Sequence, residues 1–115
     1  IHAASRDAVP SVQLDPQFPV IPVRAIQNEG TRRFTEFQRE VIAEFRAGKL
    51  EQSAAQLKIE HFWAGQLRNA VINGDVENGS LMAGQSVGMV TRIEPTADII
   101  DELVSDAVAA LARQV

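Results

Sequence analysis

The chain has 115 residues, enough for one small hydrophobic core but too short for most complete α/β enzymes. Its apolar fraction of 45% and charged fraction of 23% indicate a folded globular chain and argue against disorder. Fifteen acidic against eleven basic residues give a formal net charge of −4 without a basic block, which disfavours nucleic acids and anionic membranes as partners.

The absence of cysteine excludes disulfides and thiolate chemistry. We find no apolar run of about 18 residues that would predict a transmembrane helix, and no pattern typical of a signal peptide. These features are compatible with a cytoplasmic protein. Because the sequence starts at Ile1 rather than at a methionine, we expect it to be a piece of a longer protein.

The first third of the chain is predicted to be mostly irregular. Residues 1–9 favour a short helix that ends before Pro10. Three prolines between residues 11 and 22 predict an extended loop, and residues 23–26 favour a short extended segment. The apolar residues between 20 and 26 have no clear strand partner in the sequence, which again suggests a missing portion.

The clearest amphipathic helix is predicted from about Arg32 to Ala47, with Thr31 as its N-cap and Gly48 just after its end. Its apolar positions recur at helical spacing: Phe34, Phe37, Val41, Ile42 and Phe45.

Further helices are predicted in the rest of the chain. Residues 50–57 favour a short helix or a single turn, and residues 58–72 a helix that Asn73-Gly74-Asp75 closes. The last helix is expected from about Ala97 to Arg113, with acidic residues early and Arg113 late, as the helix dipole prefers.

Residues 79–90 are also predicted to be helical, with Gly84 and Gly88 on one side. Two glycines weaken a short helix, so they indicate close approach of either another backbone or a flat ligand. Gln85 and Ser86 offer hydrogen-bonding groups at the same place. Local pattern favours plain packing over ligand contact.

Other reactive side chains support only structural interpretations. His2 and His61 have no metal-ligand partner at suitable spacing, and neither Ser80 nor Ser86 has a nearby histidine base. Asp75 and Glu77 do not complete a calcium loop. A small basic group consists of Arg24, Arg32 and Arg33. These side chains could contact a phosphate, but pairing with surface carboxylates is the favoured interpretation.

Residues 74–90, with the sequence GDVENGSLMAGQSVGMV, resemble the C-terminal signature of the nitronate monooxygenase (2-nitropropane dioxygenase) family. This family includes FMN-dependent enoyl-acyl-carrier-protein reductases of the FabK type. Pro22-Val23-Arg24-Ala25-Ile26-Gln27-Asn28 resembles the family's Pro-x-Arg-x-x-x-Asn pattern before its helical region. Residues 1–4 resemble the stretch after a Glu-Ser pair at the end of a late barrel strand. The resemblance covers nearly the whole chain and is most specific at residues 79–90.

The resemblance implies a mainly α chain that is part of a TIM-type (β/α)₈ barrel enzyme whose barrel strands are missing here. Residues 1–22 would end the barrel region and form a proline-rich linker, residues 23–92 would form a helical substrate-side domain, and residues 93–115 would return to the barrel. FMN would be bound mainly by residues outside this chain, with Met82, Gly84, Gln85 and Ser86 lining the pocket and Met89 as a further apolar lining candidate.

The chain departs from the family in lacking the barrel strands, the FMN-phosphate loops and the catalytic histidine, whose role neither His2 nor His61 takes. The expected function is that of the C-terminal part of an FMN-dependent oxidoreductase that oxidises alkyl nitronates, inactive alone and completed by a barrel portion. An enoyl reductase of the FabK type, and a non-catalytic helical interaction module, are the alternatives. The resemblance also leaves room for a homo-oligomer.

Overall fold

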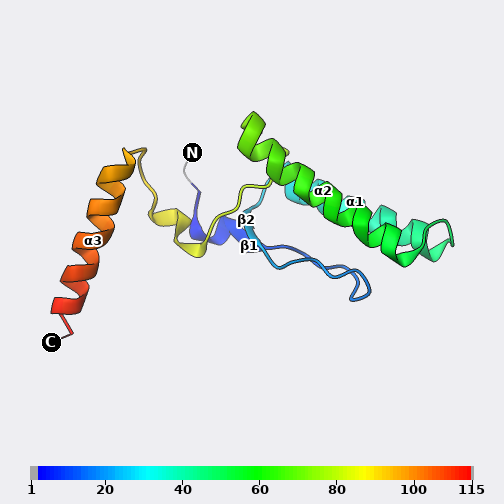
Figure 1. Cartoon of the computed structure of the whole chain (residues 1–115), viewed down its shortest axis with the longest axis horizontal. Helices are drawn as coiled ribbons and strands as arrows, with labels where there is room; N and C mark the ends of the chain where they lie inside the picture. The colour runs from blue at the N-terminus through cyan, green and yellow to red at the C-terminus, as the bar shows by residue number, and fades with distance from the viewer. Residues whose placement is uncertain (1–2, 115) are drawn as a thin grey trace.

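The computed structural model describes residues 3–114, so Ile1, His2 and Val115 lie outside the described residues. Two long helices form its most extensive contact, α1 at Glu29–Arg46 and α2 at Gln52–Asn73, which lie side by side (Figure 1). The core of this helix pair consists of apolar side chains at helical spacing from both helices, joined by Phe18 from the preceding loop: Phe34, Val41, Ile42, Ala55 and Ile59.

The N-terminus of α1 corrects the predicted boundary. Asn28, not Thr31, is the N-cap, and the helix starts at Glu29. The Asn28 Oδ1 atom accepts a hydrogen bond from the Thr31 backbone N–H at 3.0 Å, and Thr31 Oγ1 accepts one from the Asn28 N–H at 3.1 Å. This reciprocal arrangement satisfies two backbone donors that a start at Thr31 would leave open. At the other end, Gly48 has the predicted left-handed role, with φ of 72°.

The second helix is continuous, so the predicted division between residues 57 and 58 is wrong. Ala55 and Ile59, one turn apart, are both buried in the core of the helix pair. Their shared burial against α1 fixes the first turns as helix, although the local sequence is ambiguous. The helix ends at Asn73, and the φ of 66° at the C-cap residue Gly74 confirms the predicted closing turn.

A small antiparallel sheet replaces the predicted N-terminal helix. After a 3₁₀ turn, η1 at Ser5–Asp7, β1 at Ala8–Pro10 pairs with β2 at Arg24–Ile26. The other edge of β2 is joined by the Ala25–Met82 bridge. The apolar segment around residues 23–26 therefore has its strand partners within this chain, contrary to expectation. Those partners are distant in sequence, so local periodicity does not indicate them.

The proline-rich loop between the strands is extended, as predicted, and is fixed at its tip. Phe18 is buried and packs edge-to-face on Phe45, with ring centroids 5.1 Å apart. Nearby, Arg46 Nη2 lies 2.9 Å from a carboxylate oxygen of Asp15. The loop that connects β1 and β2 is thus attached to the C-terminal end of α1.

Residues 79–90 are not the predicted helix. Leu81 and Ala83 form backbone hydrogen bonds with β2, and only the short 3₁₀ helix η2 at Gln85–Met89 follows. Because the N–H and C=O groups of this segment are used by a neighbouring strand, they are not available for an α-helix. Gly84 and Gly88 consequently do not share one helix face.

The C-terminal helix α3, at Thr96–Ala112, agrees with the predicted one within a residue at each end. It lies at the opposite end of the molecule from the helix pair (Figure 1), and none of its residues is buried. The radius of gyration is 18.6 Å, well above the ~13 Å typical of a compact domain of about 100 residues. The mainly helical character is confirmed. None of the helices in residues 3–114 has the length and apolarity needed to cross a membrane.

Candidate functional site

The residues predicted to line a pocket lie in one exposed segment, residues 82–86, which runs from the Ala25–Met82 bridge into the start of η2 and which we call the exposed edge. Met82, the residue that bridges to Ala25, is 53% exposed. Gly84, Gln85 and Ser86 follow it and are exposed as well. Within residues 3–114, the Gln85 and Ser86 side chains form no hydrogen bond, so their polar groups are available to a ligand or to another part of the protein.

Backbone hydrogen bonds to β2 hold the exposed edge in place. The Ile26 N–H donates to the Leu81 carbonyl at 2.9 Å, and the Ala83 N–H donates to the Arg24 carbonyl at 3.1 Å. The Arg24 guanidinium donates in turn to the Ala8 carbonyl of β1 at 2.6 Å. Residues 81–83 are therefore held along β2 by backbone hydrogen bonds, and from Gly84 onward the chain leaves the sheet and enters η2.

The two glycines that the sequence singled out have different surroundings. A Cβ atom at Gly88 would lie 2.7 Å from Ser5 Oγ and 3.0 Å from Ser5 N, so Gly88 allows η1 to approach η2. A Cβ atom at Gly84 would meet only Ser86 Oγ, at 3.8 Å. Close approach of a backbone explains Gly88, whereas the space at Gly84 is open to a partner outside the described chain.

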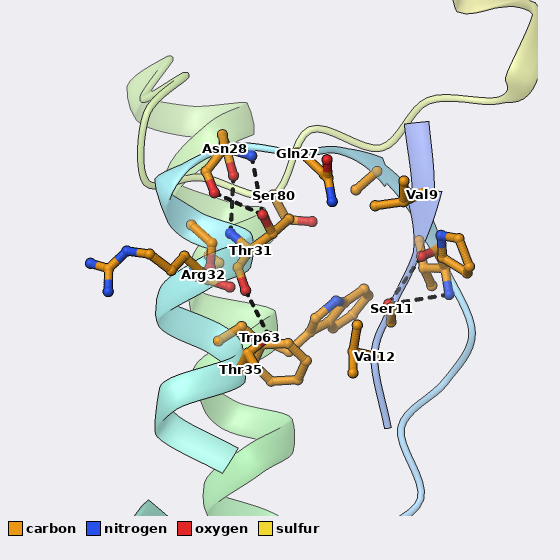
Figure 2. A pocket seen from close by; sticks show the side chains of 16 residues that line it. Val9, Ser11, Val12, Gln27, Asn28, Thr31, Arg32, Thr35, Trp63 and Ser80 are labelled. Carbon is orange, nitrogen blue, oxygen red and sulfur yellow. Dashed lines mark hydrogen bonds between the residues drawn. The ribbon is translucent and has the colours of Figure 1, made fainter. Parts of the chain in front are cut away.

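A cavity that none of residues 82–86 lines has no counterpart among the predicted sites. It has a volume of about 330 Å³ and lies between the sheet and the helix pair (Figure 2). This lies in the range of small-molecule sites, about 300–1,000 Å³. The indole of Trp63, which projects from α2, lies in the wall of this cavity. The cavity is lined by residues from segments that are distant in the sequence, which no local pattern encodes.

The lining of the cavity mixes polar and apolar side chains along its length. Gln27 and Ser80 lie at one end together with Val9, and Thr35 lies near Trp63 at the other (Figure 2). Phe34 adds a further aromatic side chain. The indole N–H of Trp63 has no acceptor within the described residues, so it is an additional donor to the cavity.

The arginines considered for phosphate binding are engaged elsewhere. Arg32 pairs with Glu29 and Glu36 on α1, and Arg33 donates to Asn78 Oδ1 at 3.2 Å. The hydrogen bond from Arg32 lowers the pKa of Glu29 and, reciprocally, raises that of Arg32. The favoured prediction of carboxylate pairing is thus confirmed for Arg32.

Asp75 has the structural role that the sequence favoured. Its carboxylate accepts hydrogen bonds from the Asn78 and Glu77 backbone N–H groups, at 2.9 and 3.1 Å, and from the Asn69 side chain at 2.8 Å. These bonds, that from the Asn78 backbone first, lower the pKa of Asp75. His61 is exposed on α2, and residues 3–114 hold no cluster of three potential metal ligands.

The residues present leave room for a flat ligand beside Gly84, but they offer no phosphate site. The exposed edge combines an open glycine with available amide and hydroxyl groups, which suits the face of a flat ring carrying polar atoms. The N-terminus of α1, a common phosphate position, is occupied by the chain itself, because the Gly30 N–H donates to the Glu77 carbonyl at 2.9 Å.

Comparisons with known proteins assign no family. No protein-family model matches the chain, and no curated protein resembles it to a significant degree. A functional proposal therefore depends on the residues of the exposed edge, on their surroundings and on the resemblance of residues 74–90.

Proposed function

We propose that this chain is the C-terminal part of an FMN-dependent oxidoreductase that resembles nitronate monooxygenase and oxidises alkyl nitronates. The observation that carries the proposal is the exposed edge, where the residues of the family-like sequence gather beside an open glycine. FMN, bound mainly by the missing barrel portion, would supply the redox chemistry. The chain alone would be inactive.

The contribution of this chain would be to orient the flavin and the substrate and to exclude water from them. Gly84 lets a flat ring approach the backbone, since no side chain occupies that space. Gln85 and Ser86 would donate and accept hydrogen bonds at the edge of the ring or of the substrate. Met82, and Met89 at the end of η2, would supply apolar contact.

The missing barrel would be the partner of α3. Six large apolar side chains of this helix are exposed: Ile99, Ile100, Leu103, Val104, Val108 and Leu111. A continuous apolar helix face of this kind is typical of a surface that another element covers. We further propose that residues 1–22 and 93–115 belong with a TIM-type barrel, that residues 23–92 are its substrate-side domain, and that the enzyme is cytoplasmic.

The rival function is that of a non-catalytic helical interaction module. It is favoured by the helix pair, whose core is formed by residues of this chain without any barrel strand. The two functions differ in their dependence on flavin. We expect FMN to bind when the chain is mixed with its barrel portion and not to bind either part alone, as measured by quenching of flavin fluorescence. If the chain mixed with its barrel portion does not bind FMN, the interaction module is supported instead.

Gly84→Ala tests the exposed edge directly. The substitution has room within this chain, and the φ of −80° at Gly84 suits alanine. We expect unchanged folding but flavin affinity lowered about tenfold or more in the reconstituted pair, because the added methyl group would meet the bound ring. One tenfold step corresponds to about 1.4 kcal/mol.

Gly65→Ala is the matched control. It lies on an exposed part of α2, where a Cβ atom meets nothing within 4 Å. This variant should bind flavin as the unaltered chain does. Equal flavin affinity of the Gly84→Ala and Gly65→Ala variants would contradict the role of the exposed edge.

A further inference from the structure

The side of α2 that faces away from α1 has no partner in the part of the chain that the structure describes. Helix α1 covers the opposite side, where the buried residues Ala55 and Ile59 lie (Figure 1). Leu57, Ala64 and Val71 lie on the uncovered side at intervals of seven residues, and all three are exposed. Residues seven apart lie nearly above one another on a helix, so these three form a single row, which we call the outer row.

Further large apolar side chains border the outer row. Ile72 follows Val71 on α2, and Ile21 belongs to the proline-rich loop; both isoleucines are exposed. Ile21 lines the same hollow as Glu60 and Ala64, which places it beside the outer row. A group of exposed apolar side chains that is bordered by charged residues is typical of a surface that binds another protein.

The residues around the outer row are arranged symmetrically about Ala64. Leu57 and Val71 lie seven residues before and after Ala64. Glu60 and Arg68, which have opposite charges, lie four residues before and after it. If a second α2 packs antiparallel with Ala64 opposite Ala64, Leu57 meets Val71 of the second copy and Glu60 meets its Arg68. Twofold symmetry then makes each of these contacts twice.

Neither charge of this pair has an opposite charge among the described residues. Glu60 accepts a hydrogen bond from the Gln56 amide at 2.8 Å but pairs with no cation there. Arg68 likewise forms no ion pair within the described chain, whereas Arg46 pairs with Asp15. Both charges are therefore available to a partner. A parallel pair of helices would bring Glu60 beside Glu60 and Arg68 beside Arg68, and such like-charge contacts are unfavourable.

We propose that the outer row is a twofold interface between two copies of this chain, in which the α2 helices pack antiparallel about Ala64. The small side chain of Ala64 lets the two helices approach at the centre, and Leu57 and Val71 provide apolar contact on either side of it. The interface is independent of the proposed function, because it uses neither the exposed edge nor α3. A dimer of this kind leaves α3 free for the barrel portion.

Charge reversal tests the interface without disturbing the fold, because both charged side chains are exposed. We expect the unaltered 115-residue chain to sediment as a concentration-dependent dimer. Glu60→Arg places two arginines at each charged contact, and Arg68→Glu places two glutamates there, so each variant should dimerise about tenfold or more weakly at low salt. A mixture of the two variants should form a heterodimer, because each contact then joins opposite charges.

Two further variants locate the interface on the molecule. Ala64→Glu places two carboxylates at the twofold axis and should abolish dimerisation while circular dichroism stays unchanged. Leu103→Ser reduces the exposed apolar face of α3 and should leave dimerisation unaltered; loss of the dimer in this variant would place the interface on α3 and overturn the proposal. A monomeric unaltered chain, or charge-reversed variants that dimerise as strongly alone as in the mixture, would overturn it as well. Loss of barrel binding in the Ala64→Glu variant would assign the outer row to the barrel instead.

Discussion

At the scale of single residues, glycine positions determine how closely the segments approach one another. A Cβ atom at Gly79 would lie 2.7 Å from the Cβ and 2.8 Å from the Cα of Ala70 on α2. A Cβ atom at Gly30 would similarly meet the Asn78 carbonyl. Neither of these glycines has a positive φ. The backbone conformation therefore does not require glycine there, and the lack of space for a Cβ atom does. The turn at residues 75–79 can lie between the two helices only for this reason.

We expect Gly79→Ala to lower the free energy of unfolding by about 1–3 kcal/mol, the usual cost of forcing a group into a packed interior. Gly65→Ala should raise it by about 0.5–1 kcal/mol, since alanine is the better helix former and the site is open. Urea unfolding followed by circular dichroism measures both changes. Equal effects of the two substitutions would show that the close approach at Gly79 does not stabilise the fold.

At the scale of elements, the turn at residues 75–79 connects the end of α2 to the start of α1. Asn28, the N-cap of α1, donates from its side-chain amide to the Val76 and Gly79 carbonyls at 2.9 and 2.8 Å. The Asp75 carboxylate stabilises the same turn by accepting hydrogen bonds from the Asn78 and Glu77 backbone N–H groups. The start of α1 therefore depends on a turn almost 50 residues later in the chain.

Asp75→Asn should destabilise the chain near neutral pH, because an amide accepts these hydrogen bonds less strongly than a carboxylate does. Since the folded-state pKa of Asp75 lies below its ordinary value of 3.8, its contribution is fully present above that pH and is lost as the pH falls through the folded-state pKa. The stability of the Asp75→Asn variant should therefore fall less on acidification than the stability of the unaltered chain.

The measurement is the urea midpoint of the unaltered chain and of the variant, near neutral pH and at several acidic values below about pH 4. Asp106→Asn, on the exposed surface of α3, is the matched control and should keep the full acid dependence. If Asp75→Asn and Asp106→Asn behave alike, the turn does not owe its stability to the Asp75 carboxylate.

At the scale of the whole molecule, the chain consists of a packed part and a helix that stands apart from it. Helix α3 makes no extensive contact with the other described elements, and its apolar residues are exposed. Hydrophobic stabilisation follows the apolar area removed from water. In this arrangement, α3 contributes little to the stability of the helix pair and the sheet.

Removal of residues 95–115 should therefore leave the urea midpoint of the remaining chain almost unchanged, within about 0.5 kcal/mol. Trp63 fluorescence reports this transition, because Trp63 lies on α2 against the core of the helix pair. A loss of several kcal/mol on truncation would mean that α3 packs on the rest of the chain in solution.

The sequence alone determined the elements whose stability is local. Apolar residues at helical spacing specified most of α1 and α3, and Gly48 and Gly74 marked helix ends through their tolerance of a left-handed backbone. The predicted pocket residues Met82, Gly84, Gln85 and Ser86 are adjacent in the sequence, so their gathering on one edge required no tertiary information beyond their common exposure.

Tertiary structure decided the features that depend on distant partners. Residues 79–90 have a helix-like composition, but β2 takes up the hydrogen bonds of Leu81 and Ala83, and the segment becomes a strand edge and a 3₁₀ turn. Pairing of β1 with β2 likewise overrides the helical pattern of residues 1–9. The cavity beside Trp63 is lined by residues of the sheet and of both helices that are far apart in the sequence. Backbone groups form hydrogen bonds with whichever partner folding brings near, and a local pattern cannot identify a partner more than 50 residues away.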